Sequence, residues 1–231
     1  MRLYEAKNKK VLRIKNGATD FLYSFSSNSA DASRGAFLDL GGNIVAAFEQ
    51  VFVNREEALI ALERQFTDRL LGHLDKYLKL GDTVIHEEDY RVYVDPEGRY
   101  APAEDEYIIF LKGPEAKSLP PLLLVTSKEL PAGVGEEEWT LFRLKNNLPV
   151  QGVDYDREMV LNVNEDLVSY TKGCYLGQEI VARVHYRGKP PKQLAVKSLE
   201  ECTPGQAAAM TSKAADPATG KTIGFVFVNK P

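Results

Sequence analysis

Apolar residues along the chain alternate or cluster in short runs that predict several β-strands. We expect a short strand at residues 11–14 and a hairpin at residues 35–53, where Gly41, Gly42 and Asn43 form a turn between two apolar runs. Gly-Pro and Pro-Pro pairs indicate further turns. The remaining strands are predicted at residues 83–86, 90–94, 107–111, 122–126, 193–198 and 222–228.

Helical spacing is clearest over residues 55–79, where apolar side chains recur every four positions and Gly81 follows the last of them. A second helix is predicted at residues 136–146, with carboxylates in its first turn that complement the helix dipole. A short third helix is predicted at residues 177–183. The stripe in the first helix is expected to be core and consists of Ala58, Leu62, Phe66, Leu70, Leu74 and Leu78.

Strands with interposed helices, and without regular β–α–β alternation, predict an α+β fold. The pair Pro190-Pro191 indicates a domain boundary. We therefore expect a large domain over residues 1–189 and a small β module over residues 190–231. A chain of 231 residues is long enough for both.

The formal net charge is −4, yet residues 172–231 carry nine Lys/Arg against four Asp/Glu. This basic part has no arginine-rich run of the kind that nucleic-acid-binding proteins use. No stretch approaches the roughly 18 apolar residues that span a bilayer, and residues 1–15 lack the apolar core of a signal peptide. We expect a cytoplasmic protein without nucleic-acid or membrane partners, in which Cys174 and Cys202 stay reduced.

The surroundings of Cys174 contain the residue types that present a reactive thiol. Gly173 and Gly177 permit tight turns, and the cation of Lys172 favours the thiolate. A nearby carboxylate, Glu179, acts in the opposite direction. From these residues alone, a reactive cysteine and a small buried hydrophobic residue are both open interpretations.

The run Lys172-Gly173-Cys174-Tyr175-Leu176-Gly177-Gln178-Glu179 resembles the signature Lys-Gly-Cys-Tyr-x-Gly-Gln-Glu of the YgfZ-type folate-binding iron–sulfur cluster assembly factors. All seven specified positions match. The resemblance implies an aminomethyltransferase-like fold, with a folate-binding α+β domain followed by a small β-barrel module. It implies cluster assembly or repair through the Cys174 thiol, with the assembly machinery or client proteins as partners. The residues that the resemblance assigns to support of the thiol are Lys172, Gly173, Tyr175, Gly177, Gln178, Glu179 and Arg183.

The same resemblance implies tetrahydrofolate as a ligand, with Trp139 stacking on its flat ring. Two departures matter. The stretch Val45-Ala46-Ala47 lacks the carboxylate that the aminomethyltransferases carry after the hairpin, so aminomethyl transfer is not expected. Lys145 stands where those enzymes have a glutamate that binds the pterin, and a cation cannot accept the N–H groups of the pterin. We therefore expect weak or no folate affinity, and core packing is the alternative role of Trp139.

Two other functions stay open: a folate-dependent one-carbon transferase, and a non-catalytic ligand-binding or scaffold protein. A hydrolase-like pair of Cys174 and His185 has little support, because they lie eleven residues apart. The run His86-Glu87-Glu88-Asp89 is typical of a solvated turn. Two cysteines cannot supply the four thiolates of a usual cluster site. We therefore expect no stably bound metal or iron–sulfur cluster, and no conventional enzyme.

Overall fold

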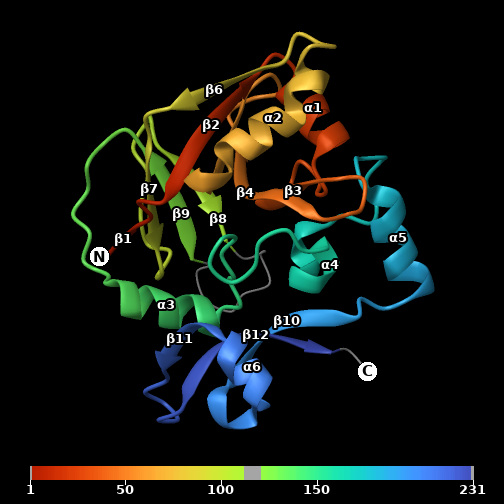
Figure 1. Cartoon of the computed structure of the whole chain (residues 1–231). Coiled ribbons are helices and arrows are strands. Elements are labelled where there is room, and N and C mark those ends of the chain that lie inside the picture. Colours follow the sequence, from red (N-terminus) through yellow and green to blue (C-terminus); the bar gives the residue numbers. More distant parts are fainter. Residues whose placement is uncertain (1, 112–120, 230–231) are drawn as a thin grey trace.

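A computed structural model describes residues 2–111 and 121–229 and contains three antiparallel sheets with helices packed on and between them. Figure 1 shows the five-stranded and four-stranded sheets in the N-terminal part and the three-stranded sheet below them. Because strands and helices are mixed without β–α–β repetition, the α+β class predicted from the sequence is confirmed.

The five-stranded sheet has the order β3-β4-β5-β2-β6, and every neighbouring pair is antiparallel. The predicted hairpin at residues 35–53 is β3 and β4, and the strand at residues 11–14 belongs to β2. Helices α1 (Ala18–Phe25) and α2 (Thr67–Leu78) cover one face of this sheet. Its strands are β2 (Lys9–Lys15), β3 (Arg34–Leu38), β4 (Ile44–Phe52), β5 (Ala58–Glu63) and β6 (Val84–Glu88).

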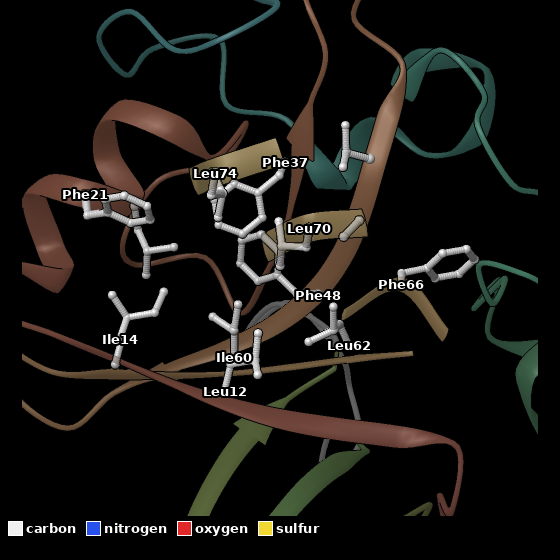
Figure 2. Packing of buried hydrophobic residues seen from close by; sticks show 14 of the residues in the cluster. Leu12, Ile14, Phe21, Phe37, Phe48, Ile60, Leu62, Phe66, Leu70 and Leu74 are labelled. Atoms are coloured by element: carbon white, nitrogen blue, oxygen red, sulfur yellow. The ribbon is translucent and has the colours of Figure 1, made fainter. Parts of the chain in front are cut away.

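The helix predicted over residues 55–79 is wrong in its first part. Residues 58–63 form β5, a short 3-10 helix follows at Arg64–Phe66, and α2 begins only at Thr67. Ile60 packs into the cluster under α1 and α2, whereas its neighbour Leu59 packs into the cluster on the opposite face of the sheet. A strand that is buried on both faces reads as a continuous apolar run, which helical spacing can imitate. The whole stripe is nevertheless core, as expected, and Figure 2 shows Ile60 and Leu62 beside Leu70 and Leu74.

The four-stranded sheet packs against the other face of the five-stranded sheet. Val92 and Val125 of the former and Val11 and Leu59 of the latter belong to one hydrophobic cluster, which Trp139 of α3 (Glu136–Lys145) borders. The strands predicted at residues 83–86, 90–94, 107–111 and 122–126 are all present, β6 among them. The sheet order is β1-β7-β9-β8, and its strands are β1 (Tyr4–Glu5), β7 (Arg91–Asp95), β8 (Tyr107–Phe110) and β9 (Leu122–Thr126).

The C-terminal part begins with α4 (Val160–Val163), a 3-10 helix (Glu165–Leu167) and α5 (Gln178–Arg187). The third sheet follows in the order β10-β12-β11, and no closed barrel forms among its described residues. The expected barrel module is therefore an open antiparallel sheet, and β10 starts just after Pro191. The elements of this part are β10 (Lys192–Ser198), a 3-10 helix (Leu199–Glu201), α6 (Pro204–Ala209), β11 (Thr211–Ala215) and β12 (Thr222–Asn229).

A buried ion pair ties this third sheet to the rest of the molecule. Arg143 of α3 donates from Nη1 to Asp154 Oδ2 at 2.7 Å, and both side chains are almost completely buried. Thr211 and Ser212 of β11 donate their hydroxyl groups to the other oxygen of Asp154. The sheet and α3 therefore share one hydrogen-bonded network, which we call the Asp154 seam.

Candidate functional site

The signature motif forms the loop that leads into α5, and Cys174 is exposed in that loop. Gly177 ends the loop with a φ of 85°, a left-handed conformation that favours glycine. A Cβ atom at this position would lie 2.4 Å from the backbone oxygen of Asp39. The start of α5 therefore rests directly on the turn between β3 and β4. Gly42 of the same turn lies close to Val181 of α5.

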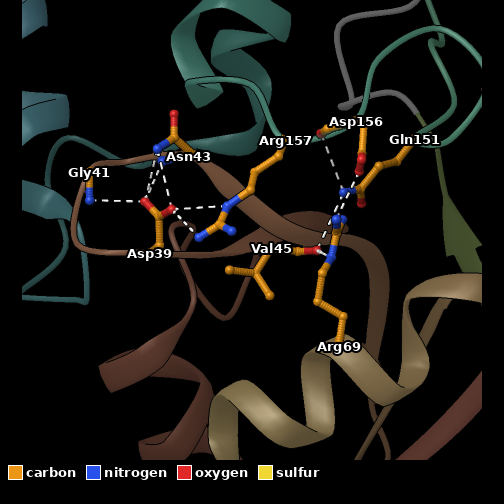
Figure 3. Close-up of polar contacts among 8 residues, drawn as sticks. All are labelled: Asp39, Gly41, Asn43, Val45, Arg69, Gln151, Asp156 and Arg157. Carbon is orange, nitrogen blue, oxygen red and sulfur yellow. Dashed lines mark hydrogen bonds and ion pairs between the residues drawn. The ribbon is translucent and has the colours of Figure 1, made fainter.

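Hydrogen bonds to Asp39 stabilise the turn beneath α5. Its carboxylate accepts from the Gly41 amide at 2.9 Å, from the Asn43 amide at 3.0 Å and from Arg157 Nη2 at 2.8 Å (Figure 3). Burial raises the pKa of Asp39, but the hydrogen bonds from Arg157, Asn43 and Gly41 outweigh it and hold the pKa below its usual range. The carboxylate is thus charged near neutral pH and keeps this platform in one conformation.

Lys172 is buried, and its ammonium group anchors the motif loop to the end of α1. Nζ donates to the carbonyl of Ser26 at 2.7 Å and to that of Asn28 at 3.2 Å. It also lies 5.1 Å from the ring centroid of Tyr23 and 5.0 Å from that of Tyr175, distances at which cation–π attraction acts. Burial lowers the pKa of Lys172 to about 8. The sequence suggested that this cation activates the thiol, whereas its contacts are with backbone oxygens and aromatic rings.

The neighbours of Cys174 in the loop are also fixed. The Gly173 amide donates to the Tyr23 hydroxyl at 2.8 Å, and a Cβ atom on Gly173 would meet that hydroxyl at 2.7 Å. Tyr175 is buried in the cluster below α5, and burial raises its pKa to about 12. With residues on both sides anchored, the loop holds the Cys174 side chain outward at the beginning of α5.

The remaining motif residues lie on α5 itself. The Gln178 amide donates to the Tyr175 carbonyl at 3.2 Å, which closes the first turn. Glu179 and Arg183 form an exposed ion pair at 2.7 Å along the helix surface. His185 lies roughly 10 Å further along the helix than Gln178, and its ring stacks on Tyr170 at 3.7 Å. The arrangement gives no support to a catalytic pair of Cys174 and His185.

Trp139, the predicted folate residue, lies in α3, away from the motif loop (Figure 1). Tyr4 stacks on it with ring centroids 4.7 Å apart, and Phe142 stacks on it at 5.6 Å. Lys145, at the end of the same helix, forms an ion pair with Asp216 at 2.8 Å. The indole and the lysine therefore already have partners within the protein.

Polar side chains surround the part of β4 where the aminomethyltransferases carry their carboxylate. Gln151 accepts from the Ala47 amide at 2.8 Å. Figure 3 shows Arg69, which donates to the Val45 carbonyl at 2.9 Å. Arg69 also binds Asp156 at 2.9 Å. Asp156 is thus held by a cation and is not placed as a free base. Sequence reasoning missed these residues because they are far apart in the chain and follow no local pattern.

A second polar group missed from the sequence lies on the face of the five-stranded sheet opposite α1 and α2. Lys9 is largely buried and forms ion pairs with Glu49 at 2.8 Å and with Glu63 at 3.0 Å. Burial lowers the pKa of Lys9, but the two carboxylates outweigh this effect and raise it. These carboxylates are therefore engaged by an internal cation, although their chemistry suits the N–H groups of a heterocycle.

Residues 2–111 and 121–229 contain no group of three or more His, Cys, Asp or Glu side chains arranged to hold a metal ion. None of the helices described is long and apolar enough to cross a membrane.

No family model matches the chain. An uncharacterised protein of Haemophilus influenzae is 26% identical over 188 residues, which cover 77% of this chain and 59% of the relative. The mitochondrial iron–sulfur cluster assembly factor IBA57 of Mus musculus is 31% identical over 93 residues, which cover 38% and 26%. Its homologue from Mycosarcoma maydis is 34% identical over 62 residues, which cover 25% and 15%. The matches thus span less than two thirds of each relative.

The fold has a clear counterpart among solved structures. The glycine cleavage system aminomethyltransferase T from Bartonella henselae superimposes with a TM-score of 0.71 over 98% of this chain and 78% of the enzyme, at 12% identity. This likeness confirms the fold expected from the motif. The chain is thus similar in sequence to iron–sulfur cluster assembly factors over part of its length, and it shares the fold of aminomethyltransferase T.

Proposed function

We propose that this protein is an iron–sulfur cluster assembly or repair factor that acts through the thiol of Cys174. The observation that carries the proposal is an exposed thiol in a loop whose neighbours are all anchored. The two relatives named as assembly factors support the same process.

The cost of building the loop favours a role for the thiol over simple packing. Gly173 and Gly177 each lose more chain entropy on folding than alanine does, by roughly 0.5–1 kcal/mol. Burial of the Lys172 ammonium adds a desolvation cost that its bonds to Ser26 and Asn28 offset. A segment that only filled space would need neither feature and would not leave its cysteine exposed.

We expect partner proteins to supply the cluster ligands that this chain lacks. Cys202, the other thiol, lies beside β10 and donates to the Ser198 carbonyl at 3.4 Å. A usual four-thiolate cluster needs more sulfur ligands than one exposed cysteine offers. We therefore propose that Cys174 works together with ligands of a partner protein, or acts on a component of the assembly machinery.

Tetrahydrofolate fits poorly around α3. Lys145 is bound to Asp216, Tyr4 is stacked on Trp139, and the carboxylates near Lys9 are held in ion pairs. We propose that folate affinity is weak or absent at Trp139, and that no aminomethyl transfer occurs, since Asp156 is bound by Arg69. The mechanism proposed for Cys174 includes no step that involves folate.

Complementation of a strain that lacks its YgfZ-type protein tests the function, with the activity of cluster-dependent enzymes as the readout. We expect Cys174→Ala and Cys174→Ser to fail and the matched Cys202→Ala variant to succeed, with circular dichroism and thermal unfolding verifying that all three fold. Full activity of Cys174→Ser would favour the scaffold alternative. Formation of methylene-tetrahydrofolate from an aminomethyl donor by the purified protein would favour the one-carbon transferase.

A further inference from the structure

The outer face of α5 carries a row of cationic and aromatic side chains that starts at the Cys174 loop. Arg183, Tyr186 and Arg187 are spaced by three and four residues, so they lie on one side of the helix. Tyr186 is 70% exposed, and the Arg183 side chain is 58% exposed. Figure 1 shows α5 at the edge of the molecule. We call these three residues the α5 docking face.

Basic residues outnumber acidic ones around this face, although Glu179 and Glu165 lie close to it. Residues 180–199 contain five Lys/Arg and no Asp or Glu. Arg183 forms an ion pair with Glu179, an exposed residue one turn earlier on the same helix. Arg187 is exposed and forms no ion pair with any residue in 2–111 or 121–229. The field at this end of α5 therefore attracts anionic groups.

The aromatic residue on this face is held in place. The Tyr186 ring packs edge-on against His185 with centroids 4.7 Å apart, and His185 stacks on Tyr170 at 3.7 Å. A groove of about 470 Å³ borders the His185 ring, and its lining includes Val184 together with one acidic and one basic residue, Glu165 and Lys189. Tyrosine and arginine are the side chains that most often dominate the energy of protein–protein contacts, particularly when they are already fixed.

We propose that the α5 docking face binds an acidic segment of a partner protein and brings that partner to the Cys174 thiol. The proposal rests on the proposed function, because it describes the partner with which Cys174 would react. A protein segment suits the face better than a polyanion does. Lipid headgroup binding uses clusters of about 4–8 cations, whereas on α5 itself only Arg183 and Arg187 flank the exposed tyrosine. The three lysines of residues 180–199 follow the end of the helix, and Lys192 is already paired with Glu158.

Disulfide exchange with synthetic peptides measures directly whether the α5 docking face brings an acidic segment to the Cys174 thiol. The full chain is used in a Cys202→Ala background, so that Cys174 is the thiol that reacts. Each short peptide carries one cysteine as a mixed disulfide with thionitrobenzoate, and the peptides differ only in being acidic, neutral or basic. The Cys174 thiolate attacks the sulfur of the peptide, a protein–peptide disulfide forms, and thionitrobenzoate leaves with the electron pair. Its absorbance gives the rate.

We expect the acidic peptide to react about tenfold faster than the neutral one at low ionic strength, and this ratio to fall as salt is added. Arg183→Glu/Arg187→Glu should remove or reverse the preference. Lys76→Glu/Lys79→Glu makes the same change in charge at the C-terminal end of α2, another exposed surface, and should keep the preference for the acidic peptide. The uncharged reagent dithiodipyridine should react equally with all three proteins, because the thiol itself is unaltered.

Equal rates for acidic and neutral peptides, or the same loss of preference in the Lys76→Glu/Lys79→Glu control, would overturn the proposal. So would binding of phosphatidylserine vesicles or of an oligonucleotide that depends on Arg183 and Arg187 when the peptides show no preference. Complementation separates this idea from the function it rests on. If Cys174→Ala complements the strain while the protein with an intact Cys174 still prefers the acidic peptide, the proposed function of the thiol is wrong and the proposal for the α5 docking face is not.

Discussion

Gly177 offers the sharpest test of how the motif loop is held. In Gly177→Ala, the new residue must keep a φ of 85°, which costs about 1–2 kcal/mol for a side chain in the left-handed region. Its Cβ would also lie 2.4 Å from the Asp39 oxygen, a backbone atom that cannot rotate away. Overpacking of this kind costs about 1–3 kcal/mol. We expect a total loss of roughly 2–5 kcal/mol in the free energy of unfolding.

Urea denaturation followed by far-UV circular dichroism measures this loss. Gly220→Ala is the matched control, because Gly220 has a φ of 71° and no atom within 4 Å of a Cβ placed there. Both variants carry the backbone cost and the same change in the unfolded chain, so their difference isolates the contact with Asp39. If Gly177→Ala is no less stable than Gly220→Ala, α5 does not rest on the hairpin turn as described.

Three further predictions concern Lys172, the Asp154 seam and folate. Burial lowers the pKa of Lys172 to about 8, so between pH 8 and the usual pKa of lysine the unfolded chain binds more protons than the folded one. The stability of the protein relative to Lys172→Met should therefore rise by up to about 2 kcal/mol across that window. A stability difference between the two proteins that does not change with pH would contradict this. Asp154→Ala should cost about 3–5 kcal/mol because it leaves Arg143 buried without its partner. Asp216→Ala frees the exposed Lys145 and should cost clearly less. Urea denaturation measures both losses, and equal losses would refute the distinction. Titration with tetrahydrofolate should change Trp139 fluorescence only at high concentration, and submicromolar binding would show that the contacts of Lys145 and Tyr4 do not block the ligand.

The sequence was informative where a local pattern decides the structure. The turn at Gly41-Gly42-Asn43 predicted the hairpin, and the glycine at position 177 marks the start of α5 within one residue. The apolar run at residues 122–126 likewise predicted β9, and the helix predicted at residues 136–146 is α3. In these segments turn chemistry and hydrophobic period agree with the final packing.

Other features depend on tertiary contacts that the sequence does not reveal. Residues 58–63 form a strand because both of their faces are covered, a fact that appears only once the two larger sheets pack together. Helix α1 was not foreseen as an element, and β11 has a weakly apolar sequence that pairs with β12. For the candidate site, the motif indicated Cys174, but the inward direction of Lys172 depends on Ser26 and Asn28, which lie more than 140 positions away.

The Asp154 seam bears on how this molecule can be divided. A chain cut before β10 would leave the carboxylate of Asp154 without the hydroxyl groups of Thr211 and Ser212, and would open the buried pair with Arg143 to water. The third sheet therefore supplies hydrogen bonds that the larger part of the protein needs in its own interior. Fragments that end near Pro191 are expected to be poor substitutes for the intact chain. Exchange of this sheet between relatives should succeed only when the exchanged sheet retains both hydroxyl groups.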